Sequence, residues 1–181
     1  MYTGKNPTAI RSKQWLSEAL VSLMKEKQYA EISVKDICRR SDLSRQTFYQ
    51  MFGSKEELAR YTIQEKFLPL QSAPEAADFD EMSQYFIRCM SENREFIRLI
   101  QQNRIGYLLA SELSQALSKA ADRLDPGRSE KTKKVANAYI TAGLTNSLLV
   151  WSQTDDLTEE ELSALLGQII RGEYYKIRWE K

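Results

Sequence analysis

Residues 45–52, RQTFYQMF, place several hydrogen-bonding side chains within barely two turns of predicted helix. Arg45 offers a fork of N–H donors, and the amides of Gln46 and Gln50 both donate and accept hydrogen bonds. Such groups suit an anionic partner that also presents hydrogen-bonding edges. Because an isolated helix shorter than about 12 residues is marginal in water, neighbouring elements must hold this segment in place.

Catalytic chemistry finds little support in the chain. No histidine occurs among the 181 residues, which removes the commonest general base and the commonest metal ligand. An SxxK pattern at Ser22–Lys25 lies inside an amphipathic helical pattern and is a chance match, and no P-loop, GxGxxG or HExxH sequence occurs. We therefore predict no catalytic residue, no cofactor and no metal, and regard a helical enzyme as the unfavoured alternative.

The composition is that of an ordinary globular protein, with 42% hydrophobic and 28% charged residues. No window of about 18 consecutive apolar residues predicts a membrane span, and the N-terminus lacks the apolar segment of a signal peptide. Cys38 and Cys89 are far apart and do not form a CxxC motif, so we predict two buried thiols. Together these features predict a cytoplasmic protein without a membrane partner.

Charge is unevenly distributed, although the whole chain has a formal net charge of +1. Residues 1–66 contain 12 Lys and Arg against 8 Asp and Glu, and the rest of the chain contains 14 against 17. A basic N-terminal part followed by a slightly acidic remainder is a weak indication of contact with phosphate groups.

Helical periodicity dominates the elements that must position these residues. Apolar residues recur at helical spacing along the chain, and no alternating run is long enough to predict a strand. Ser54–Glu57 and Thr158–Glu161 have the spacing of capping boxes, which begin helices. Residues 71–78, QSAPEAAD, form the clearest linker, and a long helical pattern over 105–124 ends at the turn 125–128. The sequence thus predicts an all-α fold.

Residues 33–52 have the organisation of a helix-turn-helix motif. A helix begins at Ser33, a four-residue turn follows at 41–44, and Ser44 is a candidate N-cap for the short helix. Phe48 and Phe52 are four residues apart, so they can bury one face of that helix against its neighbours.

The second helix of such a motif lies in the major groove of duplex DNA. There Arg45 and Gln50 could reach base edges, whereas Thr47, Tyr49 and the amide groups at the start of the helix suit phosphates. A packing module without any nucleic-acid partner is the alternative interpretation of the same residues.

The segment ISVKDICRRSDLSRQTFYQMFGSKEELARY, residues 32–61, resembles the DNA-binding domain of the TetR-type bacterial transcriptional regulators. The positions that match the family's pattern are Ser33, Ile37, Leu43, Ser44, Phe48, Tyr49, Phe52, Lys55 and Leu58. The resemblance implies phosphate contacts for Ser33, Lys35, Thr47, Tyr49 and Lys55, and places Arg45, Gln46 and Gln50 at the groove floor. With the N-cap included, the predicted DNA-binding residues are Ser33, Lys35, Ser44, Arg45, Gln46, Thr47, Tyr49, Gln50 and Lys55.

Three positions depart from the family's pattern. Met51 replaces the usual His, so a frequent DNA contact is missing. Asp42 replaces the usual Gly of the turn, and Asp tolerates left-handed backbone geometry at a modest cost. Cys38 replaces the usual Ala and adds only a little core volume. These departures affect the details of base contact more than DNA binding itself.

The resemblance also implies an architecture for the whole chain: a three-helix DNA-binding head, residues 1–53, and a six-helix ligand-binding and dimerisation body, residues 54–181. Residues 93–100 and 139–151 resemble a branch of the family that includes dihydroxyacetone kinase operon regulators.

The last two predicted helices, about 130–153 and 158–178, are the predicted homodimer interface. The first of them has apolar residues on two faces, as expected of a helix that is buried twice. The alternative is a helix at the centre of a larger monomeric core.

The family resemblance further implies a pocket for an unidentified small-molecule effector in the body. Its candidate lining residues are Tyr85, Phe86, Cys89, Phe96, Tyr107 and Trp151, each of which could instead be plain core. The expected function is ligand-responsive transcriptional regulation, with repression favoured, by a homodimer on a pseudo-palindromic operator in double-stranded DNA. The alternative is a DNA-binding regulator controlled by a second protein, a co-activator, rather than by a small molecule.

Overall fold

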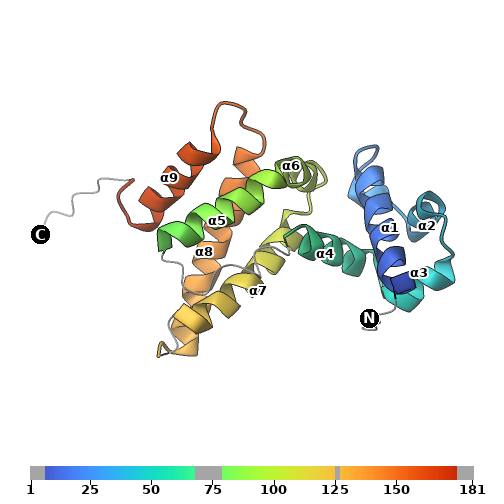
Figure 1. The fold of residues 1–181 in the computed structure, drawn as a ribbon, viewed down its shortest axis with the longest axis horizontal. Coiled ribbons are helices and arrows are strands. Elements are labelled where there is room, and N and C mark those ends of the chain that lie inside the picture. Colours follow the sequence, from blue (N-terminus) through green and yellow to red (C-terminus); the bar gives the residue numbers. More distant parts are fainter. Residues whose placement is uncertain (1–6, 68–78, 125–126, 175–181) are drawn as a thin grey trace, which may run out of the picture. The chain divides into compact units, whose positions relative to one another are not determined.

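The computed structural model describes residues 7–67, 79–124 and 127–174, and the regular elements within these ranges are all helical. The prediction of an all-α fold is thereby confirmed. The elements, drawn in Figure 1, are α1 (Pro7–Met24), the 3-10 helix η1 (Tyr29–Glu31), α2 (Val34–Ser41), α3 (Arg45–Met51), α4 (Lys55–Lys66), α5 (Phe79–Glu92), α6 (Arg94–Gln102), α7 (Gly106–Leu124), α8 (Glu130–Trp151) and α9 (Glu159–Ile170). The predicted linker at 71–78 lies outside the described residues. Within the described ranges, no helix combines the length and the apolar character that crossing a bilayer requires.

The chain divides into two compact units. The first unit comprises Met1–Lys66 with Leu99–Glu112, and the second comprises Phe67–Arg98 with Leu113–Lys181. Helix α4 belongs to the first unit, where it contacts α1. This spatial grouping differs from the sequence division predicted at residues 53 and 54, which stays a prediction about the functional domains.

The core of the first unit forms around α1, which packs against α2, α3 and α4. Leu16, Leu20 and Leu23 lie on one face of α1 at helical spacing and are at most 3% exposed. Ile37 of α2 and Phe48 of α3 are fully buried. Burying a side chain of this size stabilises a fold by about 1.5–3 kcal/mol, so these residues hold the short helices that could not stand alone.

In the second unit, α5 packs against α9. Two arginines of α6 also bind backbone carbonyls at the C-terminal end of α8. Arg94 donates from Nη2 to the carbonyl of Trp151 at 3.1 Å and to that of Thr154, and its guanidinium carbon lies 4.5 Å from the Trp151 ring centroid. Arg98 Nε donates to the carbonyl of Ser152 at 2.8 Å. The last carbonyls of a helix have no partner within it and attract cations, so these arginines stabilise the C-terminal end of α8.

Helix α8 has apolar residues on two faces, and a single chain buries only one of them. Leu148 and Trp151 are at most 2% exposed, whereas Val135 and Tyr139 are 73% and 80% exposed. A single chain therefore covers only one side of α8, because the other apolar side finds no partner helix among the described residues of the same chain.

Candidate nucleic-acid interface

Helix α2 begins and ends with local hydrogen bonds that orient the whole motif. Ser33 is the N-cap: its Oγ accepts from the Asp36 amide at 3.2 Å, and Asp36 Oδ2 accepts from the Ser33 amide at 3.0 Å. This reciprocal pair satisfies two amides that a helix start leaves open. Asp42 ends the helix in the left-handed region with φ of 55°, and its amide donates to the carbonyl of Cys38. The departure from Gly at this position is thus accommodated by Asp.

Helix α3 is set by one cap and one buried face. Ser44 Oγ accepts from the Thr47 amide at 3.0 Å, and the two hydroxyl groups lie 2.8 Å apart. Phe48 and Phe52 are at most 1% exposed, and their ring centroids are 6.0 Å apart. The predicted N-cap and the predicted buried face are both present, which leaves the opposite side of α3 exposed to a partner.

The exposed side of α3 brings together the hydrogen-bonding side chains that the sequence singled out. Arg45, Gln46, Tyr49 and Gln50 are exposed, and Thr47 is half-buried. The Arg45 guanidinium carbon lies 5.9 Å from the centroid of the Tyr49 ring, which is 50% exposed. A cation over an aromatic face is attracted to it, so Tyr49 favours one direction for Arg45. The arrangement presents donors and acceptors from one short, capped helix.

Met51, the residue that replaces the family's usual His, is buried. It packs in the core of the first unit and offers nothing to a groove, because a thioether is only a weak acceptor. Cys38 is likewise buried, and burial raises the pKa of its thiol. Both departures from the family's pattern are therefore residues that pack in the core. The prediction that Cys38 and Cys89 are buried is confirmed.

Lys55, one of the predicted phosphate contacts, is engaged within the first unit. Its Nζ donates to the carbonyls of Tyr29 at 2.6 Å and Ile32 at 2.7 Å, and it lies 4.2 Å from the Tyr29 ring centroid. Burial, and then the positive charge of Lys27, lower the pKa of Lys55, and burial raises the pKa of Tyr29 to about 12. An ammonium has three donors, so two of them secure η1 and one is left for a phosphate.

Asn103 belongs to the first unit and was not anticipated from the sequence. Its Oδ1 accepts from the Tyr29 amide at 2.6 Å, and its Nδ2 donates to the carbonyls of Met24 and Leu99, each at 3.0 Å. Asn103 is 6% exposed and thereby joins the end of α6 to the end of α1 and the start of η1. An Asn after an apolar helix suggests only a helix end, since its partners Tyr29 and Met24 lie more than 70 residues away in sequence.

Asp36 provides a pH-dependent prediction for the capping box. Hydrogen bonds from Lys27 Nζ at 2.9 Å, and then from the Ser33 amide and hydroxyl, hold the pKa of Asp36 well below its ordinary value of 3.8. A depressed folded-state pKa stabilises the fold above the unfolded-state pKa, and this stabilisation is lost as pH falls toward the folded-state pKa. Replacing Asp36 with Asn should therefore lower the urea midpoint by a constant amount above about pH 5, with the difference shrinking below it. A difference that grows as the pH falls would contradict this role.

The second unit contains five of the six predicted effector-pocket residues. Cys89, Phe96 and Trp151 are buried, and Tyr85 and Phe86 are half-buried. The Trp151 indole donates to the carbonyl of Leu157 at 3.0 Å, and Phe96 packs against Phe67 with ring centroids 6.3 Å apart. Tyr107 differs from the other five, because it is 56% exposed and belongs to the first unit.

A set of large apolar side chains stays exposed on α8, on α9 and just after α9. These are Val135, Tyr139, Ile140, Val150, Ile169, Ile170 and Tyr174, with exposed fractions between 38% and 80%. Scattered apolar residues are normal on a surface, but six on two consecutive helices and a seventh just after them suggest a surface that another molecule covers.

Comparison with known proteins agrees with this geometry. Residues 16–62, which include α2 and α3, match the family model for bacterial regulatory proteins of the tetR family. The uncharacterized HTH-type transcriptional regulator YxbF of Bacillus subtilis (strain 168) is 41% identical over 56 residues, 30% of this chain and 15% of that protein. The HTH-type dhaKLM operon transcriptional activator DhaS of Lactococcus lactis subsp. lactis (strain IL1403) is 28% identical over 99 residues, 55% of this chain and 48% of that protein. The chain thus matches less than half the length of either relative.

Solved structures extend the likeness over almost the whole chain. Lin0861 from Listeria innocua has a TM-score of 0.78 at 16% identity and covers 95% of this chain and 96% of its own. A TetR transcriptional regulator from Streptococcus agalactiae 2603V has a TM-score of 0.65 at 19% identity, covering 90% of this chain and 95% of its own. At such low identities the likeness establishes the fold.

Proposed function

We propose that this chain is a DNA-binding transcriptional regulator of the tetR family, whose family model matches residues 16–62, and that it binds a pseudo-palindromic operator as a homodimer. In this proposal each subunit places α3 in the major groove. Successive half-sites lie about 34 Å apart along the duplex, or a multiple of that distance, because the groove repeats once per turn. The single observation that supports it best is the exposed, capped face of α3 with Arg45, Gln46, Tyr49 and Gln50.

Roles for individual side chains follow from their chemistry. Arg45 can donate two hydrogen bonds to guanine, and Gln46 or Gln50 can pair with adenine through both amide atoms. Tyr49, Lys35 and the third donor of Lys55 suit phosphates, which set register without specifying sequence. The hydroxyl groups of Ser33, Ser44 and Thr47 already take part in the caps, so we assign them to holding the helix starts against the duplex.

Replacing Arg45 with alanine should weaken operator binding about tenfold, because one good base contact is worth about 1–3 kcal/mol. Fluorescence anisotropy with the DNA upstream of the protein's own gene would measure this. Lys25→Ala is the matched control, since it removes one positive charge from an exposed residue just after α1 and leaves α3 unchanged. Wild-type affinity should also fall steeply with salt, as phosphate-dominated binding does. Equal losses in both variants, or binding insensitive to salt, would contradict the assignment.

The homodimer is proposed to form through the exposed apolar side chains of α8 and α9. A two-fold axis would pair this surface with itself, as isologous dimers do. The proposal explains why α8 has apolar residues on two sides although one chain buries only one of them.

Truncating Tyr139 to alanine should weaken the dimer about tenfold, because a large aromatic side chain near the centre of an interface often contributes more than 1 kcal/mol. Sedimentation across a dilution series would give the dissociation constant. Gln102→Ala removes an exposed side chain that belongs to the first unit and not to α8 or α9, and it should leave the constant unchanged. A wild-type protein that stays monomeric at all concentrations would refute this interface.

Control by a small-molecule effector is the favoured mechanism, with Tyr85, Phe86, Cys89, Phe96 and Trp151 as candidate pocket residues. A ligand that prefers one arrangement of the two DNA-binding helices would lower operator affinity by its differential affinity, commonly about 1–3 kcal/mol. Repression relieved by such a ligand is the expected outcome.

Control by a protein partner, a co-activator, is the second candidate, and the similarity to a protein described as a transcriptional activator fits a regulator that activates. Purification from native cells would distinguish the two mechanisms. A stable heteromer that binds the operator, without any small molecule, would favour the partner.

A further inference from the structure

One carboxylate of α7 holds two side chains of α4 within the first unit. Glu112 accepts from Arg60 Nη1 at 3.2 Å and from Gln64 Nε2 at 2.8 Å. The same Arg60 nitrogen donates to Ser111 Oγ at 2.9 Å. We call these four residues the α4–α7 latch. They are separate from the exposed face of α3, from the exposed apolar side chains of α8 and α9 and from the candidate effector pocket.

The latch restrains both the rotation of α4 and its movement along its own axis. Arg60 and Gln64 are four residues apart, so they lie one turn apart on the same side of the helix. Because they bind different oxygens of one carboxylate, α4 cannot turn or slide without losing a hydrogen bond. The Glu112 side chain is only 9% exposed, and a buried carboxylate left without a partner is costly. The charge-assisted bond from Arg60 is therefore favoured over an open arrangement.

Helix α4 is in turn fixed to the two helices of the DNA-binding motif. Lys55, the first residue of α4, donates to the carbonyls of Tyr29 and Ile32, and the second of these directly precedes the N-cap of α2. Phe52, the C-cap of α3, is 1% exposed, and its ring centroid lies 5.3 Å from that of Tyr61 in α4. The direction of α4 is thus linked to the direction of α3.

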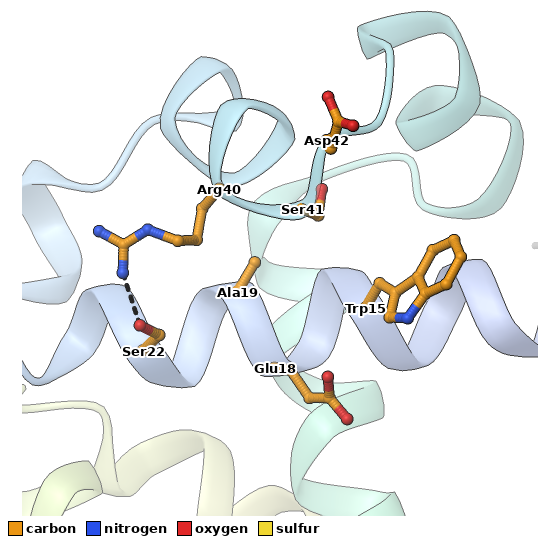
Figure 2. A pocket seen from close by; sticks show the side chains of 7 residues that line it. All are labelled: Trp15, Glu18, Ala19, Ser22, Arg40, Ser41 and Asp42. Carbon is orange, nitrogen blue, oxygen red and sulfur yellow. Dashed lines mark hydrogen bonds between the residues drawn. The ribbon is translucent and has the colours of Figure 1, made fainter.

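Helices α1 and α2 are held together at the other side of the motif. Figure 2 shows Arg40, near the end of α2, directed toward Ser22 of α1, to whose hydroxyl it donates at 2.5 Å. The two terminal nitrogens of Arg40 also donate to the carboxylate of Glu26, at 2.8 and 2.7 Å. Such a fork fixes one relative orientation of the groups it joins. We therefore expect a movement of α4 to carry α3 with it, because the remaining helices of the motif resist separate rearrangement.

We propose that Glu112 is a positioning residue for operator binding, which sets the direction of α3 through Arg60 and Gln64. The inference rests on the proposed function, in which a dimer reads two half-sites of one operator. One added base pair moves a half-site by about 3.4 Å and rotates it by about 35° around the duplex. A dimer can reject such a change in spacing only if each α3 is held in a fixed direction. Glu112 is thus a determinant of the half-site spacing that the dimer accepts.

The first measurement compares binding to the operator with binding to variants that have one base pair added or removed between the half-sites. Glu112→Gln, the latch variant, removes the charge but keeps the size of the side chain. Its preference for the natural spacing should fall about two- to fivefold, the usual value of an ion pair near the surface. Glu56→Gln is the control variant, because Glu56 also binds Arg60 but belongs to α4 itself, and it should keep the wild-type preference. A ratio of two affinities does not depend on the folded fraction, so lower stability alone leaves it unchanged.

The second measurement needs no DNA and reports on the first unit alone. Cys38 and Cys89 are buried, so spin labels attach selectively to cysteines introduced at exposed positions. Gln46→Cys places one label on α3, and Gln102→Cys places the other at the end of α6. Double electron–electron resonance gives the distribution of distances between the two labels, and an excess of unlabelled protein restricts the signal to pairs within one chain. The distribution should broaden in the latch variant and match wild type in the control variant.

Two results would overturn the role of Glu112. One is a distance distribution that is unchanged in the latch variant or changed equally in both variants. The other is a latch variant that binds the operator with the full wild-type preference for one spacing. A wild-type protein that binds no operator would instead refute the proposed function, and the distance distribution would still decide whether Glu112 positions α3.

Discussion

Replacing Phe48 with alanine should destabilise the first unit by about 3–5 kcal/mol and abolish operator binding. Phe48 is fully buried at the centre of α3, where its ring lies 5.3 Å from that of Tyr49 and 6.0 Å from that of Phe52. Removing the ring leaves a cavity beneath a helix of seven residues that cannot persist without its packing. Since domains of this size are stable by only about 5–15 kcal/mol, the loss is a large fraction of the total.

Phe48→Leu is the matched control, because a smaller change in volume should cost less than about 1.5 kcal/mol and keep α3 in place. Urea denaturation followed by circular dichroism would measure stability, and anisotropy with operator DNA would measure binding. Phe48→Ala with wild-type stability would contradict the role assigned to this ring. So would Phe48→Ala that still binds operator with wild-type affinity.

Replacing Asn103 with alanine should destabilise the first unit by about 2–4 kcal/mol. The substitution removes the acceptor for the Tyr29 amide and the donor to the Met24 carbonyl, both in buried surroundings. Each buried polar group left without a partner costs about 1–3 kcal/mol. The amide of Tyr29 should exchange with solvent much faster in the variant, and hydrogen exchange over residues 25–33 would detect this.

Gln102→Ala provides the matched control, because it removes the exposed amide of the last residue of α6, one position before Asn103. Its stability should stay within about 0.5 kcal/mol of wild type. Faster hydrogen exchange in both variants would mean that residues 25–33 are protected by the helical stability of the end of α6 and not by the Asn103 hydrogen bonds. Unchanged exchange at Tyr29 in Asn103→Ala would exclude the bridge altogether.

The helix-turn-helix was predictable because its determinants are local. The caps at Ser33 and Ser44 form with amides three residues away, and the spacing of Phe48 and Phe52 places both on one side of a single helix. Neighbours at i and i+3 or i+4 meet in any helix, so the sequence is enough to identify them. Once the buried residues of α3 are identified from the sequence, the remaining residues must form its exposed polar side.

Short sequence patterns predicted the hydrogen-bond partners of some other polar side chains less reliably. The Ser54–Glu57 spacing predicted a capping box, and Ser54 Oγ does accept from the Glu57 amide at 3.1 Å. The Glu57 carboxylate, however, accepts from the amide of Gly53 at 2.7 Å, one residue before the expected donor. Lys55 similarly matched a family pattern of phosphate contact, yet it donates to the carbonyl of Tyr29 in η1, an element that periodicity did not predict, and to that of Ile32 just after it.

Sequence alone predicted the all-α fold from helical periodicity, and residues 32–61 predicted the match of residues 16–62 to the tetR family model, because both depend on short-range spacing. Only the tertiary structure decided which polar residues are structural. Asn103 bridges segments more than 70 residues apart, Arg94 covers the end of α8, and Tyr107 belongs to the first unit. Such assignments depend on which distant backbone groups a side chain meets, and spacing along a chain does not specify distances across it.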